Sequence, residues 1–399
     1  MKILNKLNQI HTKLMLNNSI HCKLSLKKTF STTHKINKQN IDFVELRSDV
    51  KTLPTQKMRE SVLFKEFGDN NKFEDEVVEK LERKVAKLLG KERGLYVPSG
   101  LMGNYVCILL NISRGDYLIQ GEISHIHKIE IGTQNLLGIE QIVIKTNEDA
   151  TLDINEEILL RIIENNKKDD IVRRIKVLTL ENTNNFLGGA ILPLNYIDVI
   201  KKICVKVQNK YSGFAPKFHL DGSRVLNAAA ALNCDPAELV KGFDTVNMCL
   251  SKGVGAPVGS VVCLDNKHYL AAAEIRRLLG GAMRQAGFIA APALIALEDW
   301  RERFNIDHKN AKLLYNGIRD IKGIKVRESD TNIINVVIDN PFKNKIDQFI
   351  HLLDTKYKVK VSNMFDGEYI RLVTHHQVSE LQIQQAIDAF NKVGKEIFG

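Results

Sequence analysis

The sequence predicts an α/β protein in which a mainly parallel sheet is covered by helices on both faces and is followed by a smaller α+β domain. The first observation is that helical patterns alternate with short apolar, strand-like runs from about residue 75. Strands separated by helices require right-handed crossovers, which place a parallel sheet between two helical layers. The second observation is that the pattern changes after Arg303 to short strands between two helices, which indicates a separate domain.

The expected elements follow in order along the chain. In the first part we expect helices over 76–89, 102–111, 195–207 and 282–303. Apolar runs predict strands over 117–120, 141–145, 175–181, 217–221, 244–250 and 259–264. The second part predicts a helix over 307–320, short strands near 333–338, 357–362 and 368–373, and a closing helix over 379–397. We therefore predict a large domain with an N-terminal arm over 41–304 and a small C-terminal domain over 305–399.

Residues 1–40 differ in composition from the rest of the chain. Residues 1–41 hold eight of the 57 Lys+Arg residues and none of the 47 Asp+Glu residues, which leaves 49 basic and 47 acidic residues, a balance of +2. Ile3, Leu7, Ile10 and Leu14 recur at helical spacing, in a segment rich in Ser, Thr and Asn. This profile predicts a mitochondrial presequence and a matrix location, and the alternative is a disordered basic tail on a cytoplasmic protein.

The nearly neutral body excludes some classes of function. Because the excess positive charge is confined to the leader, we expect no nucleic-acid-binding surface. No apolar run reaches the roughly 18 residues that a membrane helix needs, so we expect no membrane span.

The six cysteines are scattered without a CxxC pair, which favours buried thiols over a disulfide scaffold.

Three turns next to predicted strands carry residues suited to chemistry, and ligands of parallel sheets bind at the carboxyl ends of the strands. The first turn, over 98–104, places Ser99, Gly100 and Leu101 at the start of a predicted helix. Backbone N–H groups at a helix N-terminus, together with the helix dipole, favour a bound anion. The alternative is a structural loop.

The second turn ends an apolar strand with Asp221, followed by Gly222 and then by Arg224. A carboxylate at a strand end can face a positively charged ring nitrogen. The alternative is that Asp221 caps a helix over 224–232 and that Arg224 forms a surface ion pair.

The third turn, over 247–260, delivers Lys252 from an apolar strand into a stretch of Gly, Ala and Ser. A lysine held among small groups and partly removed from water can form a Schiff base, whereas the alternative is an ordinary solvated lysine. Together the three turns supply an anion cradle, a carboxylate and a reactive amine. These are the parts that pyridoxal 5'-phosphate (PLP) requires.

At these residues the sequence resembles the threonine aldolases, in the beta-eliminating lyase group of fold type I PLP enzymes. The match extends from about Leu46 to the C-terminus. It rests on the blocks LRSD (46–49), PSGLMGN (98–104), HIHKIE (125–130), LENTNN (180–185), HLDGSR (219–224), CLSKGVGAPVGS (249–260), GGAMRQAG (280–287) and IRLVTHH (370–376). The resemblance implies the fold type I architecture and PLP as the cofactor.

The resemblance also implies a role for each matching residue. In catalysis it implies a Schiff-base lysine, a carboxylate at the pyridinium nitrogen and a histidine that stacks on the pyridine ring, at Lys252, Asp221 and His125. The resemblance implies further residues that contact the phosphate or lie beside the ring. They are Ser99, Gly100, Leu101, Arg224 and, from a neighbouring subunit, Arg284. The substrate and its α-carboxylate would be bound by Ser48, Arg224 and Arg371.

The sequence departs from the family pattern close to the substrate. Where the family has an active-site Tyr followed by Gly, this chain has Lys72 and Phe73, and Asn184 stands in place of a His. Leu101 replaces a Thr and so removes a hydroxyl donor to the phosphate. The His-x-His spacing at 125–127, with an acid at 130, leaves a zinc site as an alternative for this block, although we assign no metal ligand.

The activity implied by the resemblance is that of a PLP-dependent lyase. It cleaves L-threonine or L-allo-threonine to glycine and acetaldehyde by retro-aldol cleavage of the Cα–Cβ bond. Two alternatives stay open, a related PLP lyase acting on another β-hydroxy amino acid and a catalytically weak paralogue that binds PLP. With Asn184 in place of the His, the base for the substrate hydroxyl is His125 or a phosphate-bound water. The resemblance further implies a homotetramer with active sites shared between subunits.

Overall fold

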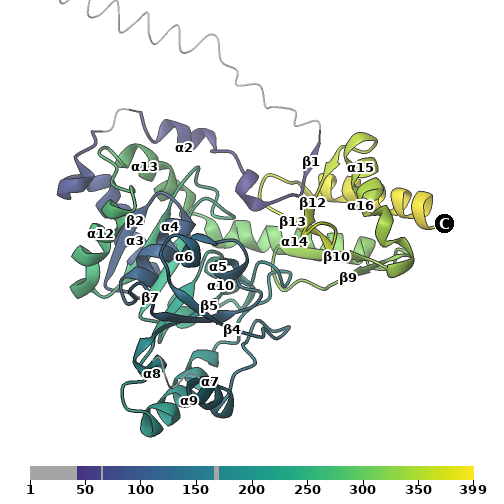
Figure 1. Ribbon diagram of the computed structural model, residues 1–399. Helices are drawn as coiled ribbons and strands as arrows, with labels where there is room; N and C mark the ends of the chain where they lie inside the picture. Colours follow the sequence, from purple (N-terminus) through teal and green to yellow (C-terminus); the bar gives the residue numbers. More distant parts are fainter. Residues whose placement is uncertain (1–42, 64–65, 166–169) are drawn as a thin grey trace, which may run out of the picture. The chain divides into compact units, whose positions relative to one another are not determined.

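A seven-stranded sheet contains most strands of the first part of the chain (Figure 1). The computed structural model describes residues 43–63, 66–165 and 170–399, and Val44–Gly399 belong to one compact unit. In sheet order the strands are β2 (Arg93–Val97), β8 (Ser260–Leu264), β7 (Thr245–Cys249), β6 (Lys217–Asp221), β5 (Ile175–Glu181), β3 (Tyr117–Gly121) and β4 (Glu140–Ile144). Neighbours from β7 to β4 are parallel, while β8 is antiparallel to β2 and β7. The predicted mainly parallel sheet is confirmed.

Alternating side chains of β2 and β8 enter two different cores. In β2, Tyr96 packs into one hydrophobic cluster, whereas Leu95 and Val97 pack into another on the opposite face. A strand that is buried on both faces reads as a mainly apolar run, which is why the sequence could predict β5, β7 and β8.

Fifteen α-helices surround the sheets in the described part of the chain. They are α2 (Gln56–Glu60), α3 (Glu76–Leu88), α4 (Gly100–Leu109), α5 (His125–Lys128), α6 (Gly132–Asn135), α7 (Glu156–Asn165), α8 (Ile171–Arg174), α9 (Tyr196–Lys210), α10 (Val225–Ala231), α11 (Pro236–Val240), α12 (Tyr269–Leu278), α13 (Gly287–Ala296), α14 (Trp300–Ile318), α15 (Ile346–Thr355) and α16 (Glu380–Phe398). The expected single helix over 282–303 is wrong, because α13 ends at Ala296 and α14 begins at Trp300.

The second part of the chain forms a four-stranded antiparallel sheet, in the order β12 (Ser362–Met364), β13 (Tyr369–Val373), β10 (Ile333–Ile338) and β9 (Ile324–Val326). A separate pair joins β1 (Val44–Glu45) to β11 (Val359–Lys360). The long helix α14 runs through the expected domain boundary, with Phe304 in the core of the first part and Leu314 in the core of the second. One continuous helix therefore contributes side chains to both cores.

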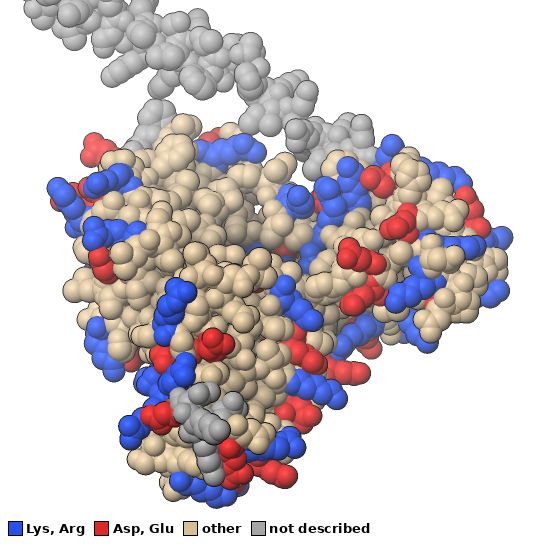
Figure 2. All heavy atoms as spheres, viewed as in Figure 1, with Lys and Arg blue, Asp and Glu red and all other residues tan. Residues whose placement is uncertain are grey.

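The surface of the described residues carries both signs of charge. Figure 2 shows Lys and Arg interspersed with Asp and Glu on the visible face, as the balance of +2 for the body predicts. No helix among the described residues is both long and apolar enough to cross a bilayer. The expected presequence over 1–40 lies outside the described residues.

Candidate active site

The first predicted turn leads into α4 through tightly packed glycines. A Cβ on Gly100 would lie 2.4 Å from Cys249 Sγ, and one on Gly103 would lie 2.1 Å from Asn247 Oδ1, so the glycines let α4 pack against β7. Ser99 is the N-cap, and its Oγ accepts a hydrogen bond from the Met102 N–H at 3.2 Å. The first N–H groups of a helix have no partner within it, so the start of α4 offers donors to an anion.

Asp221 ends β6 as a buried carboxylate with defined partners. Its Oδ1 accepts hydrogen bonds from the N–H (3.1 Å) and the hydroxyl (2.6 Å) of Ser223. Burial acts to raise the pKa of Asp221, but the Lys252 ammonium and His125 outweigh burial, so the pKa is lowered. Asp221 therefore stays ionised inside the protein. The helix-cap alternative is wrong, because α10 begins after Arg224 and has no side-chain cap.

Asn104 connects Asp221 to a second buried acid, and the sequence did not reveal this role. Its Nδ2 donates to Asp221 Oδ2 at 3.1 Å and to Glu130 Oε1 at 2.8 Å. Its Oδ1 is hydrogen-bonded to His219 Nε2 at 3.2 Å and accepts a hydrogen bond from Asn247 Nδ2 at 2.9 Å. Both hydrogens and the oxygen of the Asn104 amide are therefore hydrogen-bonded, and the amide holds the Asp221 and Glu130 carboxyl groups in position.

His125 begins α5 and lies beside this network. Its Nδ1 is 2.9 Å from Glu130 Oε1. Burial acts to lower the pKa of His125, but the hydrogen bond to Glu130 and the charges of Asp221 and Glu181 together outweigh burial, so the pKa is raised. Burial also raises the pKa of Glu130, and the Asp221 charge adds to this shift while His125 opposes it. The Glu130 carboxyl group therefore orients the His125 imidazole, and Nε2 can contact a reactant.

The zinc alternative for this block does not fit the observed contacts. His127 Nδ1 is 3.0 Å from Gln141 Oε1 on β4, so His127 does not share a site with His125. Ligand atoms of His125, Glu130 and Asp221 do lie within 4.8 Å of one another. However, Glu130 Oε1 and Asp221 Oδ2 already accept hydrogen bonds from Asn104, which accounts for their proximity.

Lys252 follows β7 on a tight turn, in which the Gly255 N–H donates to the Lys252 carbonyl at 2.7 Å. Its side chain is half-buried, and among the described residues its Nζ has no hydrogen-bond or salt-bridge partner. The Lys252 charge nevertheless helps to lower the pKa values of both Asp221 and Asp49. An amine that lies near two carboxylates without pairing to either is available for covalent chemistry.

Arg224 forms a buried ion pair with Asp49, a residue to which the sequence gave no role. Its Nη2 and Nε donate to Asp49 Oδ1 and Oδ2 at 2.8 and 2.9 Å. Burial acts to raise the pKa of Asp49, but Arg224 overrides burial and holds it below its usual range. The surface-pair alternative for Arg224 is therefore wrong.

Arg371 approaches Arg224 through a shared acceptor. Asn185 Oδ1 accepts from Arg224 Nη1 at 3.2 Å and from Arg371 Nη1 at 2.9 Å. Arg371 Nη2 also donates to the Arg47 carbonyl at 3.3 Å, next to the buried Ser48. Burial and the Arg224 charge lower the pKa of Arg371. The structure thus brings the two arginines and the segment around Ser48 together into a cationic group.

Asn184, which replaces the family His, is occupied by backbone contacts. Its Oδ1 accepts from the Phe186 and Leu187 N–H groups at 3.1 and 3.0 Å, and its Nδ2 donates to the Ile123 carbonyl at 3.3 Å. It therefore holds the turn after β5 and is not a base.

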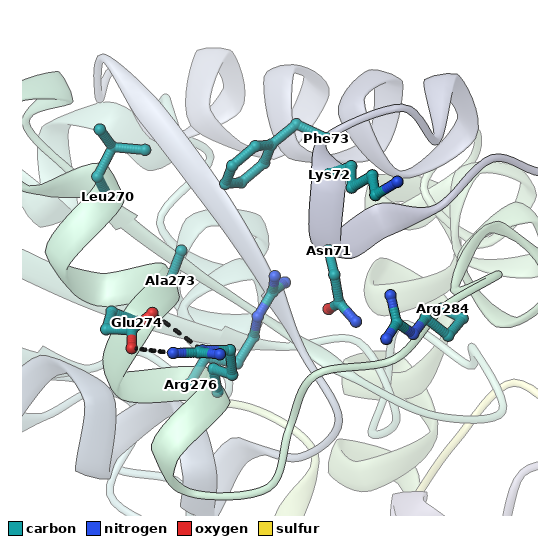
Figure 3. Close-up of a pocket in the computed structure, with 9 residues that line it drawn as sticks. Asn71, Lys72, Phe73, Leu270, Ala273, Glu274, Arg276 and Arg284 are labelled. Carbon is teal, nitrogen blue, oxygen red and sulfur yellow. Dashed lines mark hydrogen bonds and ion pairs between the residues drawn. The ribbon is translucent and has the colours of Figure 1, made fainter.

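Arg284 is not brought to this group within one chain. Its side chain is 66% exposed and Nη1 donates to Asp69 Oδ2 at 2.8 Å. It lines a pocket of about 490 Å³ whose other residues, shown in Figure 3, include Asn71, Lys72 and Phe73. Two of the positions that depart from the family pattern, Lys72 and Phe73, thus line a pocket together with Arg284, and Lys252 is not among its lining residues.

Three comparisons with known proteins agree with one another. A family model described as beta-eliminating lyase matches residues 45–341. "Probable low-specificity L-threonine aldolase 2" of Arabidopsis thaliana is 36% identical over 357 residues, which cover 88% of this chain and 97% of that protein. The low specificity L-threonine aldolase of Escherichia coli K12 is 31% identical over 344 residues, covering 86% and 96%. A solved Leishmania major threonine aldolase shares the fold, with a TM-score of 0.70, 15% identity and coverage of 88% and 99%.

Proposed function

The chain belongs to the beta-eliminating lyase family, and we propose that it is a PLP-dependent lyase that cleaves L-threonine or L-allo-threonine into glycine and acetaldehyde. The observation that supports this most strongly is the arrangement around Lys252. Its amine has no partner among the described residues, and an ionised carboxylate, Asp221, lies near it inside the protein. Both relatives described above are named as threonine aldolases, which supports the substrate class.

The residues present fit PLP. Lys252 would hold the cofactor, Asp221 would bind its ring nitrogen, and His125 would cover the ring. The first N–H groups of α4, at Gly100 and Leu101, would bind the phosphate. When bound, PLP supplies an electron sink for the bond that breaks at the substrate Cα.

The remaining steps depend on this chain's own side chains. Arg371 and Ser48 would hold the substrate carboxylate, and the Arg224–Asp49 pair would keep the arginines apart and in place. Because Asn184 is occupied by hydrogen bonds to backbone groups and to Glu181, His125 is the base that we propose for the β-hydroxyl proton. Its Nδ1 is bonded to Glu130, so the proton would be accepted at Nε2.

We also propose that active sites are completed by a neighbouring subunit in a homotetramer. The exposed Arg284, which is ion-paired to Asp69, supports a role outside its own subunit. Residues 1–40 are proposed to direct import into the mitochondrial matrix. Fusing them to a reporter should carry it into mitochondria, and a cytosolic reporter would contradict the proposal.

The function is tested by loading residues 41–399 with PLP and assaying threonine together with a panel of β-hydroxy amino acids. We expect a visible band of lysine-bound PLP and release of acetaldehyde from threonine, both lost in Lys252→Ala. The exposed Lys241→Ala is the matched control and should keep both. Cleavage of another panel member only would support the related lyase. A band without any turnover would indicate the weak paralogue, and no band would overturn the cofactor assignment.

A further inference from the structure

Two buried donor groups on β13 have no acceptor. Tyr369 and Arg371 are two residues apart on one strand, so their side chains leave the same face of the sheet. The Tyr369 hydroxyl and Arg371 Nε are both inaccessible to solvent and have no hydrogen-bond partner among the described residues. Buried polar groups are normally paired, and leaving one unpaired costs stability. Such unpaired donors on one face are suited to an acceptor that a ligand supplies.

A row of aromatic rings places Tyr369 relative to the proposed cofactor site. The Tyr369 and Phe365 ring centroids are 6.1 Å apart, and those of Phe365 and Phe186 are 5.0 Å apart. Phe186 in turn lies 6.3 Å from the His125 ring, at an interplanar angle of 9°. The row thus runs from the histidine proposed to cover the cofactor to the strand that carries Arg371.

The chemistry of the two donors identifies the acceptor as an anion. Arg371 is cationic, and its Nη1 and Nη2 already donate to Asn185 and to the Arg47 carbonyl, whereas its buried Nε–H has no acceptor among the described residues. Burial raises the pKa of the Tyr369 phenol to about 12, so it keeps its proton and can donate. A carboxylate has two oxygens and can accept from both groups at once.

We propose that Tyr369 is a substrate-binding residue whose hydroxyl donates to the α-carboxylate of the amino acid held by Arg371. This role rests on the proposed function, since it takes the ligand to be an amino acid. It is a contact that the family resemblance did not supply, because Tyr369 lies just before the IRLVTHH block.

The test measures binding separately from turnover. The PLP-loaded protein is titrated with glycine, which has a carboxylate but no bond to cleave, and with ethanolamine, an amine that lacks the carboxylate. The cofactor absorbance reports binding of both ligands. In Tyr369→Phe we expect the Kd for glycine to rise about tenfold, as for loss of one hydrogen bond to a charged group, with the Kd for ethanolamine unchanged. The KM for threonine should rise by a similar factor with little change in kcat.

A matched control is Tyr315→Phe on α14, whose ring lies against Arg319 outside this row and should change neither Kd. A second variant, Phe365→Leu, keeps the Tyr369 hydroxyl but removes the aromatic ring that packs against Tyr369. It should weaken glycine binding by less than Tyr369→Phe. Equal weakening of glycine and ethanolamine, or an unchanged Kd for glycine, would overturn the role of Tyr369. Loss of glycine affinity in a protein that cleaves no β-hydroxy amino acid would instead overturn the proposed function alone.

Discussion

Replacing Asn104 by Leu tests whether one amide holds the centre of the site. The change preserves the approximate side-chain volume but removes both donors from Glu130 and Asp221, at 2.8 and 3.1 Å. Both acceptors are buried carboxyl groups. A hydrogen bond to a charged group contributes about 1.5–3 kcal/mol, so the two together give a loss of about 3–6 kcal/mol in the free energy of unfolding. That is a large share of the roughly 5–15 kcal/mol that stabilises a typical domain.

The assay is equilibrium denaturation in the absence of PLP, followed by PLP titration of the folded protein. We expect lower stability and weaker PLP binding, since Asp221 loses the donor that orients Oδ2. The matched control is Asn111→Leu, just after the same helix, which loses one long contact to the Cys107 carbonyl at 3.4 Å. A loss in Asn104→Leu no larger than in the control, with unchanged PLP affinity, would refute the role assigned to Asn104.

Three further predictions follow from the buried charges and the exposed arginine. Burial, together with the Asp49 charge, raises the pKa of Asp307 to about 8 from an ordinary value of 3.8, so the folded chain keeps a proton that the unfolded chain releases, and stability falls as pH rises between these values. Asp307→Asn should therefore be more stable than the wild type by an amount that grows from pH 4 to 8, and denaturation curves with a constant difference across this range would argue against it. Asp49→Asn should destabilise by about 3–5 kcal/mol because Arg224 is left buried without its partner, and a change below 1 kcal/mol would contradict the buried pair. Arg284→Ala should lower PLP affinity while sedimentation shows intact assembly, and unchanged affinity would count against a shared site.

The sequence predicted the site residues that are recognisable from their neighbours in the chain. It missed the site residues whose roles depend on contacts with distant parts of the chain. Asp221 ends one strand and Lys252 comes soon after the end of another, so their position at the edge of the sheet could be predicted from neighbouring residues. Asn104 and Asp49 gain their roles only from partners 117 and 175 residues away in the chain, at Asp221 and Arg224. No local pattern carries that information.

The same limit explains the error in the helix over 282–303. Periodicity continues across 297–299, where the helix breaks, and no Gly or Pro marks the break. The one proline of this region, Pro292, instead lies inside α13. In the structure α14 packs against α10 and α16, and the sequence pattern does not record this packing.

The central claim is that this chain breaks the Cα–Cβ bond of threonine. The most direct measurement incubates the PLP-loaded protein with L-threonine and quantifies glycine, acetaldehyde and ammonia over the same time course. We expect glycine and acetaldehyde in equal amounts and no ammonia. Release of ammonia with a 2-oxo acid would show elimination instead of cleavage, and the absence of every product from a protein that binds PLP would contradict the proposed activity.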